Sequence, residues 1–188
     1  LTNMGDWNIS RKRYYGMPLP FYPCSCGHIT VIGSKAELRE NAVDPAQVDA
    51  LPELHRPWVD EVKIKCPHCG KEVSRVSDIG DVWLDAGIVP FSTLGYFTDR
   101  EAWEKNFPAE WVTEMHEQVR LWFYSMLFMS TVLVGKAPYE KVVTNGMVVA
   151  EDGSKFSKTG FMIKFDEAAE KIGADTVRYL YASAPSNN

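Results

Sequence analysis

Four cysteines in two short pairs constrain the fold of this 188-residue chain more than any other feature. Cys24 and Cys26 stand in CSCGH, and Cys66 and Cys69 stand in CPHCGK. In the second pair, the proline and the glycine shape a turn that lets both thiolates face one metal ion. Two such pairs joined by a longer loop are the usual arrangement for structural, tetrahedral Zn²⁺. The sequence therefore predicts a zinc-ribbon module over residues 24–76, with all four cysteines as ligands.

The spacing of the first pair leaves alternatives open. Cys-x-Cys is tighter than the common Cys-x-x-Cys, so His28 or His68 could replace a cysteine as a ligand. Two disulfides, or four reduced thiols without metal, are the other readings, and disulfides are not expected in a cytosolic protein. With four protein ligands the metal would have no open position, so we expect a structural rather than a catalytic ion.

Composition excludes several classes of protein. The chain is 45% hydrophobic and 24% charged, as expected of a globular protein. Its net charge of −5 argues against a mainly basic nucleic-acid binder, and the densest basic run, SRKR at 10–13, is by default a solvated face. The most apolar stretch, 121–135, is shorter than the ~20 residues that span a bilayer. No signal peptide is visible, so we expect a cytoplasmic protein without membrane segments.

The first part of the chain has signals for short elements. The proline-rich residues 1–23 should form a strand and a loop, because the residue before a proline favours extended backbone. Ser34 is a good helix cap, so a helix is expected over 35–41. Residues 43–61 are expected to be loop-like, and the alternation in DEVKIKC predicts a strand that enters the second cysteine pair.

After about residue 77, strand and helix signals alternate. This alternation is typical of an α/β fold with a parallel sheet and crossover connections. Strands are expected within 80–91, 109–115 and 139–150, the last interrupted at Asn145-Gly146. Helices are expected at 98–107 with Thr98 as cap, at 117–134, at 166–173 and at 174–183, with Gly173 as the break between the last two.

Two groups of residues could bind a substrate near the expected strand ends. Glu114 ends a strand and Glu117 and Gln118 open a helix, at the edge where open α/β sheets bind ligands. Acidic residues also favour helix N-termini for electrostatic reasons alone. Trp83 and Trp122 could wall an apolar pocket, although tryptophan is ordinarily part of a core.

Two further segments could contact a phosphate chain. Gly146, after Asn145, permits close backbone approach to a ligand, and a strand bulge is an equal alternative. In AEDGSKFSKTGF (150–161), Lys155 and Lys158 could neutralise charge on a polyphosphate. The alternative is a solvated hairpin tip, because Asp152-Gly153 is a turn signal.

Taken in order, these segments resemble the class I aminoacyl-tRNA synthetases. KFSKT (155–159) is similar to the Lys-Met-Ser-Lys-Ser loop that closes over ATP, and DWNISRKRYYGMPLP resembles the return from the editing insertion of the isoleucyl, valyl and leucyl group. DVWLDAGIVPF resembles that group's Trp-x-Asp-Ser-Gly motif. TEMHEQVRLWFY and the cysteine insert ending in CPHCG resemble the isoleucyl enzymes most. Five ordered motifs are far more specific than any one of them.

The resemblance implies both a fold and a reaction. The fold would be α/β, the second half of a Rossmann-like class I synthetase nucleotide fold with an inserted zinc-ribbon module. Residues 1–23 would be the return segment, 24–76 the zinc ribbon and 77–188 the second half of the catalytic domain. The reaction would join isoleucine to ATP, giving an aminoacyl-adenylate and pyrophosphate, and pass the acyl group to tRNA. Mg²⁺ would accompany ATP, and the SRKR run would lie near the tRNA acceptor end.

The resemblance also implies roles for residues at matching positions. Lys155 and Lys158 would be the catalytic residues that steady the ATP phosphates, with Asn145 and Gly146 beside ATP. The residues expected to contact the amino acid or the adenylate are Glu114 for the ammonium, Glu117 and Gln118 for the adenylate, and Trp83 and Trp122 for the aliphatic side chain.

The sequence departs from the family pattern at several points. Phe156 and Thr159 replace the usual Met and Ser of the lysine loop, and Glu117 replaces an Asp. The His-Ile-Gly-His signature of the first half does not occur in these residues. We therefore expect a fragment that is inactive alone and needs the missing first half as a partner. The alternatives are a valyl- or leucyl-tRNA synthetase fragment and a non-catalytic zinc-ribbon binding module related to synthetases.

Overall fold

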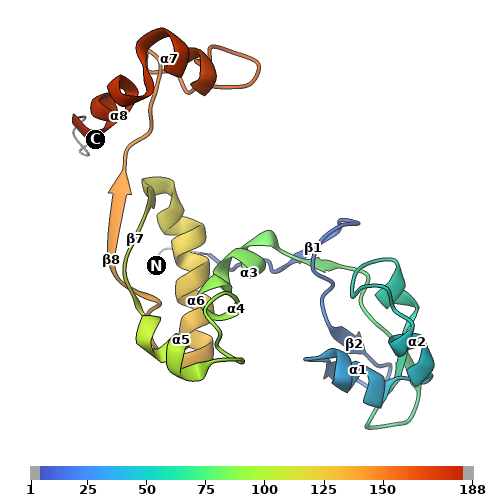
Figure 1. The fold of residues 1–188 in the computed structure, drawn as a ribbon. Helices are drawn as coiled ribbons and strands as arrows, with labels where there is room; N and C mark the ends of the chain where they lie inside the picture. The colour runs from blue at the N-terminus through green and yellow to red at the C-terminus, as the bar shows by residue number, and fades with distance from the viewer. Residues whose placement is uncertain (1–4, 184–188) are drawn as a thin grey trace. The chain divides into compact units, whose positions relative to one another are not determined.

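The computed structural model describes residues 5–183 and divides the chain into two compact units (Figure 1). The first unit extends to Val89 and the second begins at Pro90. The first unit consists of short strands and helices, whereas the second contains a parallel strand pair and longer helices. Each unit has its own buried residues and is considered by itself.

The first unit is built from three two-stranded antiparallel sheets. These are β1 (Ser10–Arg11) with β6 (Ile79–Gly80), β2 (Phe21–Pro23) with β3 (Ile29–Val31), and β4 (Lys63–Lys65) with β5 (Glu72–Ser74). The β2–β3 turn contains Cys24 and Cys26, and the β4–β5 turn contains Cys66 and Cys69. The strand expected in DEVKIKC is confirmed as β4.

A small apolar core lies behind the two cysteine-bearing hairpins. Tyr22 of β2, Ile64 of β4 and Cys66 are almost completely buried there. Ser34 caps the helix α1 (Lys35–Asn41) by accepting a hydrogen bond from the Glu37 N–H at 3.1 Å, as the sequence predicts. This core therefore supports both cysteine turns from one side.

The expectation of a loop over residues 43–61 is wrong. This segment forms α2 (Pro45–Asp49) and a 3₁₀ helix, η1 (Trp58–Glu61). The Asp44 carboxylate accepts a hydrogen bond from the Ala46 N–H at 3.0 Å, and Pro45 occupies the first turn, where its missing N–H costs nothing. Val48 and Val59 are buried, so the helices supply core residues that a loop would leave exposed.

Asp60 joins two arginines in the first unit. Its carboxylate accepts a hydrogen bond from Arg56 Nε at 2.7 Å and is paired with Arg75 Nη2. The Arg75 side chain is only 1% exposed, and its Nη1 also donates to the carbonyls of Leu19 and Asp78. Desolvation raises the pKa of Asp60, but hydrogen bonds from Arg75 and Arg56 outweigh it and hold this pKa below its usual range.

We expect Asp60→Asn to destabilise the first unit by about 3 kcal/mol, because it leaves the buried Arg75 charge without its partner. Urea unfolding followed by circular dichroism measures the change. A carboxylate with a lowered pKa contributes stability above its unfolded pKa and loses it as the pH falls. The difference between the variant and the parent should therefore shrink below about pH 4.

The exposed pair of Arg39 and Asp49 provides the control for this substitution. Both side chains are more than half exposed, so Asp49→Asn should cost less than about 1 kcal/mol. Equal losses from the two variants would contradict a special role for the Asp60 cluster.

The strand expected within residues 80–91 is also wrong. The chain forms α3 (Val82–Gly87) and then α4 (Val89–Ser92). The buried Asp81 carboxylate accepts a hydrogen bond from the Trp83 N–H at 2.8 Å and is paired with Arg11. A short apolar run is compatible with either structure, and here the helix-capping aspartate selects the helix.

The second unit contains a parallel strand pair joined by a crossover helix. β7 (Ala109–Met115) pairs with β8 (Tyr139–Asn145), and α6 (Trp122–Val134) runs beside both strands (Figure 1). The Tyr139 hydroxyl donates to the Phe123 carbonyl at 3.0 Å, which ties β8 to α6. This β–α–β unit confirms the expected parallel arrangement.

The crossover helix is shorter and less buried than the sequence predicts. Residues His116–Arg120 form a separate 3₁₀ helix, η2, and the backbone at Leu121 (φ −119°, ψ −103°) interrupts the helical path before α6. Phe123 and Met126 are buried, whereas Val132 and Leu133 are exposed. Among the described residues, no helix is long and apolar enough to cross a membrane.

The remaining helices are close to expectation. α5 (Arg100–Asn106) is capped by Asp99, whose carboxylate accepts from the Ala102 N–H at 3.0 Å, and not by Thr98. Asp99 is the residue directly before the helix, which is the cap position. After β8, α7 (Phe165–Ile172) and α8 (Ala174–Ser183) are separated at Gly173, as predicted.

Candidate functional site

The carboxyl ends of β7 and β8 bring together several of the candidate residues. In the parallel register, Glu114 is opposite Thr144 and Met115 is opposite Asn145. Glu114 therefore lies beside the end of β8, where Asn145 and Gly146 begin the following loop. This is the edge of a parallel sheet at which ligands bind.

Glu117 and Gln118 lie on η2, directly after β7. The Gln118 side-chain oxygen accepts a hydrogen bond from the Trp122 N–H at 3.1 Å, so it satisfies one of the free N–H groups at the start of α6. Its amide NH₂ group is not used in that bond. Gln118 thus combines a structural contact with a donor at the strand edge.

The segment 150–161 contains a hairpin at its tip. Val149 and Lys155 form an antiparallel bridge, and the Ala150 N–H donates to the Ser154 carbonyl at 2.9 Å. Gly153 has φ +80°, which favours glycine, and the Ser154 N–H donates to the Asp152 carboxylate at 2.9 Å. The turn expected at Asp152-Gly153 is confirmed as local structure.

A contact between Lys155 and Glu117 joins this loop to the strand edge. Lys155 Nζ lies 3.1 Å from Glu117 Oε1, and the two side chains are 67% and 43% exposed. An ion pair this exposed contributes little to stability. The ion pair matters because it positions Lys155, a residue of the loop, next to η2. Lys158 is exposed, and no contact of its side chain with the strand edge occurs among residues 5–183.

The phenylalanine at position 156 has a local packing partner. Its ring makes an edge-to-face contact with Phe161, with centroids 5.6 Å apart. The Ser157 N–H donates to the Phe161 carbonyl at 3.4 Å. The segment between the two rings, which contains Lys158, is therefore a closed turn rather than an extended chain.

The two candidate pocket tryptophans belong to different units. Trp83 lies on α3 in the first unit, and Trp122 begins α6 in the second. Their pairing around an aliphatic side chain therefore stays a prediction. Trp83 lines a cavity of about 420 Å³ within the first unit, together with Arg11, Arg13, Tyr15, Asp81 and Asp85.

Sequence reasoning missed the two aspartates of this cavity. Asp81 caps α3 and Asp85 lies one helical turn later, so both flank Trp83. The available signal was an Asp at a cap position four residues before another Asp, which places both on one face of a helix.

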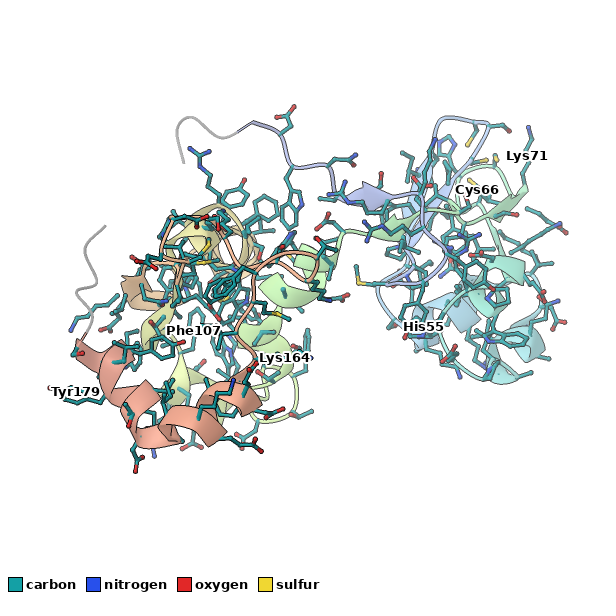
Figure 2. The ribbon with its side chains drawn as sticks, turned by 90° about the horizontal axis from the view of Figure 1, so that it is seen from above. His55, Cys66, Lys71, Phe107, Lys164 and Tyr179 are labelled. Atoms are coloured by element: carbon teal, nitrogen blue, oxygen red, sulfur yellow. The ribbon has the colours of Figure 1, made fainter. Side chains whose placement is uncertain are left out.

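The four cysteine sulfurs converge at one point in the first unit. Cys24 Sγ is 3.4 Å from Cys69 Sγ, and Cys26 Sγ is 3.8 Å from Cys66 Sγ. All four sulfurs lie within 4.8 Å of one another, and Figure 2 shows them gathered near Cys66 and Lys71. These separations are too long for disulfides and close to the ~3.8 Å expected between thiolates around tetrahedral Zn²⁺.

The turns that carry the sulfurs are closed by backbone hydrogen bonds. The Gly27 N–H donates to the Cys24 carbonyl at 2.9 Å, and the Gly70 N–H donates to the Cys66 carbonyl at 2.8 Å. Both glycines have φ between 70° and 90°, which a side chain would strain. His28 and His68 stack on each other at 6.0 Å and are not part of the four-sulfur group.

The thiols also differ in their protonation. The Cys26 N–H hydrogen bond and the neighbouring thiols lower the pKa of Cys24 to about 6. The Lys71 N–H favours the thiolate of Cys69, but the thiol of Cys24 and desolvation by the neighbouring atoms raise the pKa of Cys69 to about 12. A thiolate at Cys24 therefore opposes the formation of a second one at Cys69, because closely spaced like charges repel.

The whole chain, residues 1–188, matches the family described as tRNA synthetases class I (I, L, M and V). The chain belongs to this family. The chain also superposes on a solved structure described as the ternary complex of Agrobacterium radiobacter K84 agnB2 LeuRS-tRNA-LeuAMS. The superposition includes 98% of this chain, with a TM-score of 0.70 and 25% sequence identity. It covers 25% of that chain. The fold is therefore that of a class I synthetase catalytic domain.

Similar curated proteins over the full chain are isoleucine–tRNA ligases. The chain is 43% identical over 190 residues to that of Clostridium novyi (strain NT), covering 98% of this chain and 18% of the relative. It is 46% identical over 184 residues to that of Methanoculleus marisnigri, covering 96% and 17%. The chain spans less than a fifth of the length of these relatives. The resemblance to class I synthetases, and to the isoleucyl enzymes among them, is confirmed.

Proposed function

We propose that this chain supplies the lysine-loop half of an isoleucine–tRNA ligase active site. The observation that supports this most is the contact between Lys155 and Glu117, which joins the loop to the carboxyl edge of β7 and β8. At this edge the lysines of the loop could bind a polyphosphate, and the carboxylates at the strand end could bind the ammonium group of an amino acid. The identity of 43% and 46% to two isoleucine–tRNA ligases, along almost the whole of this chain, supports the same reaction.

In this proposal the amino-acid carboxylate attacks the α-phosphorus of ATP. A carboxylate oxygen–phosphorus bond forms, the bond from the α-phosphorus to the bridging oxygen breaks, and pyrophosphate leaves with the electron pair. Lys155 and Lys158 neutralise the charge that grows on the leaving phosphates. Lys155 exchanges the Glu117 carboxylate for phosphate oxygens when ATP binds. Mg²⁺ would share the phosphate charge with these lysines.

The strand edge positions the amino acid and the adenylate. Glu114 accepts only the N–H of the adjacent Met115, at 3.2 Å, among the residues described, so its carboxylate can accept the substrate ammonium. Gln118 keeps its NH₂ donors for the adenylate, and Gly146 permits the backbone to approach ATP. Trp83 and Trp122 would enclose the aliphatic side chain.

The cysteine cluster is proposed as a structural zinc site. Four thiols at tetrahedral spacing fit Zn²⁺, and each comes from a turn with a glycine in the left-handed region. Residues 24–76 would then be a zinc ribbon, between the return segment 1–23 and the catalytic segment 77–188. The ion would fix the two hairpins against each other and would take no part in the chemistry.

The complete enzyme requires partners beyond this chain. Adenylate formation would need the first half of the nucleotide fold, and acyl transfer would need tRNA. The basic run at residues 10–13 would face the acceptor end of that tRNA. We propose that this chain alone makes no adenylate.

Amino-acid-dependent ATP–pyrophosphate exchange by the full-length protein tests the proposed function. Isoleucine should support exchange at least about tenfold more efficiently than valine, because one methylene in an apolar pocket is worth about 1–3 kcal/mol. Leucine, which has the same size and a different branch point, is the matched control. Higher efficiency with valine or leucine would indicate a valyl- or leucyl-tRNA synthetase. No exchange with any of the three amino acids would support a non-catalytic zinc-ribbon module.

A further inference from the structure

A buried carboxylate at the start of α3 is shared by two partners. Asp81 is only 2% exposed, and a charged side chain is seldom buried unless it is paired. One of its carboxylate oxygens accepts the Trp83 N–H at 2.8 Å, and the other is paired with Arg11. Capping alone does not require a charge, because the neutral side chains of Asn and Ser cap helices as well as Asp does. The pairing with Arg11 therefore has a role beyond the helix cap.

Backbone contacts join the same two segments of the chain. β1 pairs with β6, which directly precedes α3. The Asp81 N–H donates to the Ile9 carbonyl at 2.8 Å, and the Gly80 N–H donates to the Met17 carbonyl at 2.7 Å. A Cβ atom at Gly80 would lie 2.7 Å from Met17 Cε, so the approach is too close for a larger residue. The start of α3 is thus packed against the segment that carries Arg11.

The Arg11–Asp81 pair and Trp83 line the same cavity, of about 420 Å³, within the first unit. The hydrogen bond to Asp81 fixes the backbone of Trp83 in the first turn of α3. With the backbone fixed, the tryptophan side chain has only a few rotamers, and its ring has few positions. The ion pair therefore acts on the position of the indole at the cavity wall.

A purely stabilising role is the alternative, and the same unit contains an ion pair of that kind. Arg75, which is paired with Asp60, has a side chain only 1% exposed and lies in the interior. The Arg11 side chain is 38% exposed and lies at the cavity wall. A partly exposed pair contributes less to stability than a fully buried one loses when it is broken. The location of the Arg11–Asp81 pair therefore favours a role in shaping the cavity.

We propose that Arg11 and Asp81 are positioning residues that hold Trp83 for the choice between isoleucine and valine. The inference rests on the proposed function, in which Trp83 contacts the aliphatic side chain of the amino acid. An apolar pocket distinguishes one methylene by a factor of about 10–200. A gap of about 0.5–1 Å at its wall forfeits about a quarter to a half of the dispersion attraction. Arg11 and Asp81 act through Trp83 and contact no reacting atom.

Pyrophosphate exchange by the full-length protein tests the pair through two single variants. Arg11→Gln removes the cation, and Asp81→Asn removes the negative charge but keeps a good helix cap. Each variant should raise KM for isoleucine about tenfold and reduce the preference for isoleucine over valine, with KM for ATP within about twofold. Arg11→Lys, which keeps the charge, should retain most of the affinity. The double variant should be no worse than either single variant, because both remove the same interaction.

Asp44→Asn is the matched control, because Asp44 caps α2 through the same hydrogen bond to the N–H two residues later. Asp44 forms no ion pair with any residue between 5 and 183. Its substitution should change neither KM. Equal effects of Asp44→Asn and Asp81→Asn, or equal increases in KM for isoleucine and ATP, would reduce the Arg11–Asp81 pair to a structural role and overturn the proposal.

Fluorine NMR of the full-length protein labelled with 5-fluorotryptophan follows Trp83 without any activity. Trp83→Phe assigns its resonance. This resonance should shift in Arg11→Gln and Asp81→Asn and stay in place in Asp44→Asn. An unchanged resonance in both variants of the pair would overturn the proposal. A parent protein without exchange would instead contradict the proposed function, and the resonance shift would still decide whether the pair positions Trp83.

Discussion

Lys158→Ala in the full-length protein should slow isoleucine-dependent pyrophosphate exchange by at least about a hundredfold. Removing one preorganised charge or donor that acts on a transition state typically costs a factor of about 10²–10³. Lys158 is exposed and makes no ion pair within residues 5–183, so its loss should leave the fold intact. Exchange kinetics and circular dichroism of the purified variant measure the two effects separately.

The matched control is Lys136→Ala, another exposed lysine of the second unit that lies outside the loop. It should retain exchange within about twofold, because exposed charges beyond a Debye length of about 8–10 Å are largely screened. Unchanged exchange in Lys158→Ala would exclude a role in phosphate binding. Equal loss in both variants would point to general destabilisation instead.

Cys66→Ala should abolish zinc binding and unfold the hairpin region of the first unit. Cys66 is a proposed zinc ligand, and because its side chain is only 2% exposed it is also part of the core. Structural Zn²⁺ contributes about 10–16 kcal/mol of apparent binding free energy in small domains, more than a core of this size could replace. Elemental analysis should give about one zinc per parent chain and almost none for the variant.

His28→Ala and His68→Ala are the controls for this experiment, because neither imidazole belongs to the four-sulfur group. Both variants should keep a full complement of zinc. Loss of zinc from either variant would show that this histidine, and not one of the four cysteines, is a zinc ligand. A parent protein that is fully folded after exhaustive chelation would contradict the structural role of the metal.

The helix caps illustrate how far local sequence signals reach. Ser34 predicts a helix over 35–41, and the helix has these bounds, because a cap acts within three residues. Asp44 and Asp81 cap helices in the same way, in two segments whose apolar pattern alone predicts a loop and a strand. At both positions the capping side chain, rather than the apolar run that follows it, indicates the helix.

Other features depend on contacts between distant residues. The break at Leu121 and the exposure of Val132 and Leu133 follow from how α6 packs beside β7 and β8, which hydropathy does not report. The contact of Lys155 with Glu117 joins segments on either side of the crossover helix. Neither segment contains a local signal for the other.

By itself, the sequence determined the cysteine spacing, the capped helices and the order of motifs, because each depends on residues within a few positions of one another. Only the tertiary structure decided that four sulfurs meet within 4.8 Å and that His55 stacks on Tyr15. It also decided that Lys155 lies at the edge of the parallel strands. These contacts arise because packing within each unit brings remote segments of that unit together. No local pattern encodes which segments will meet.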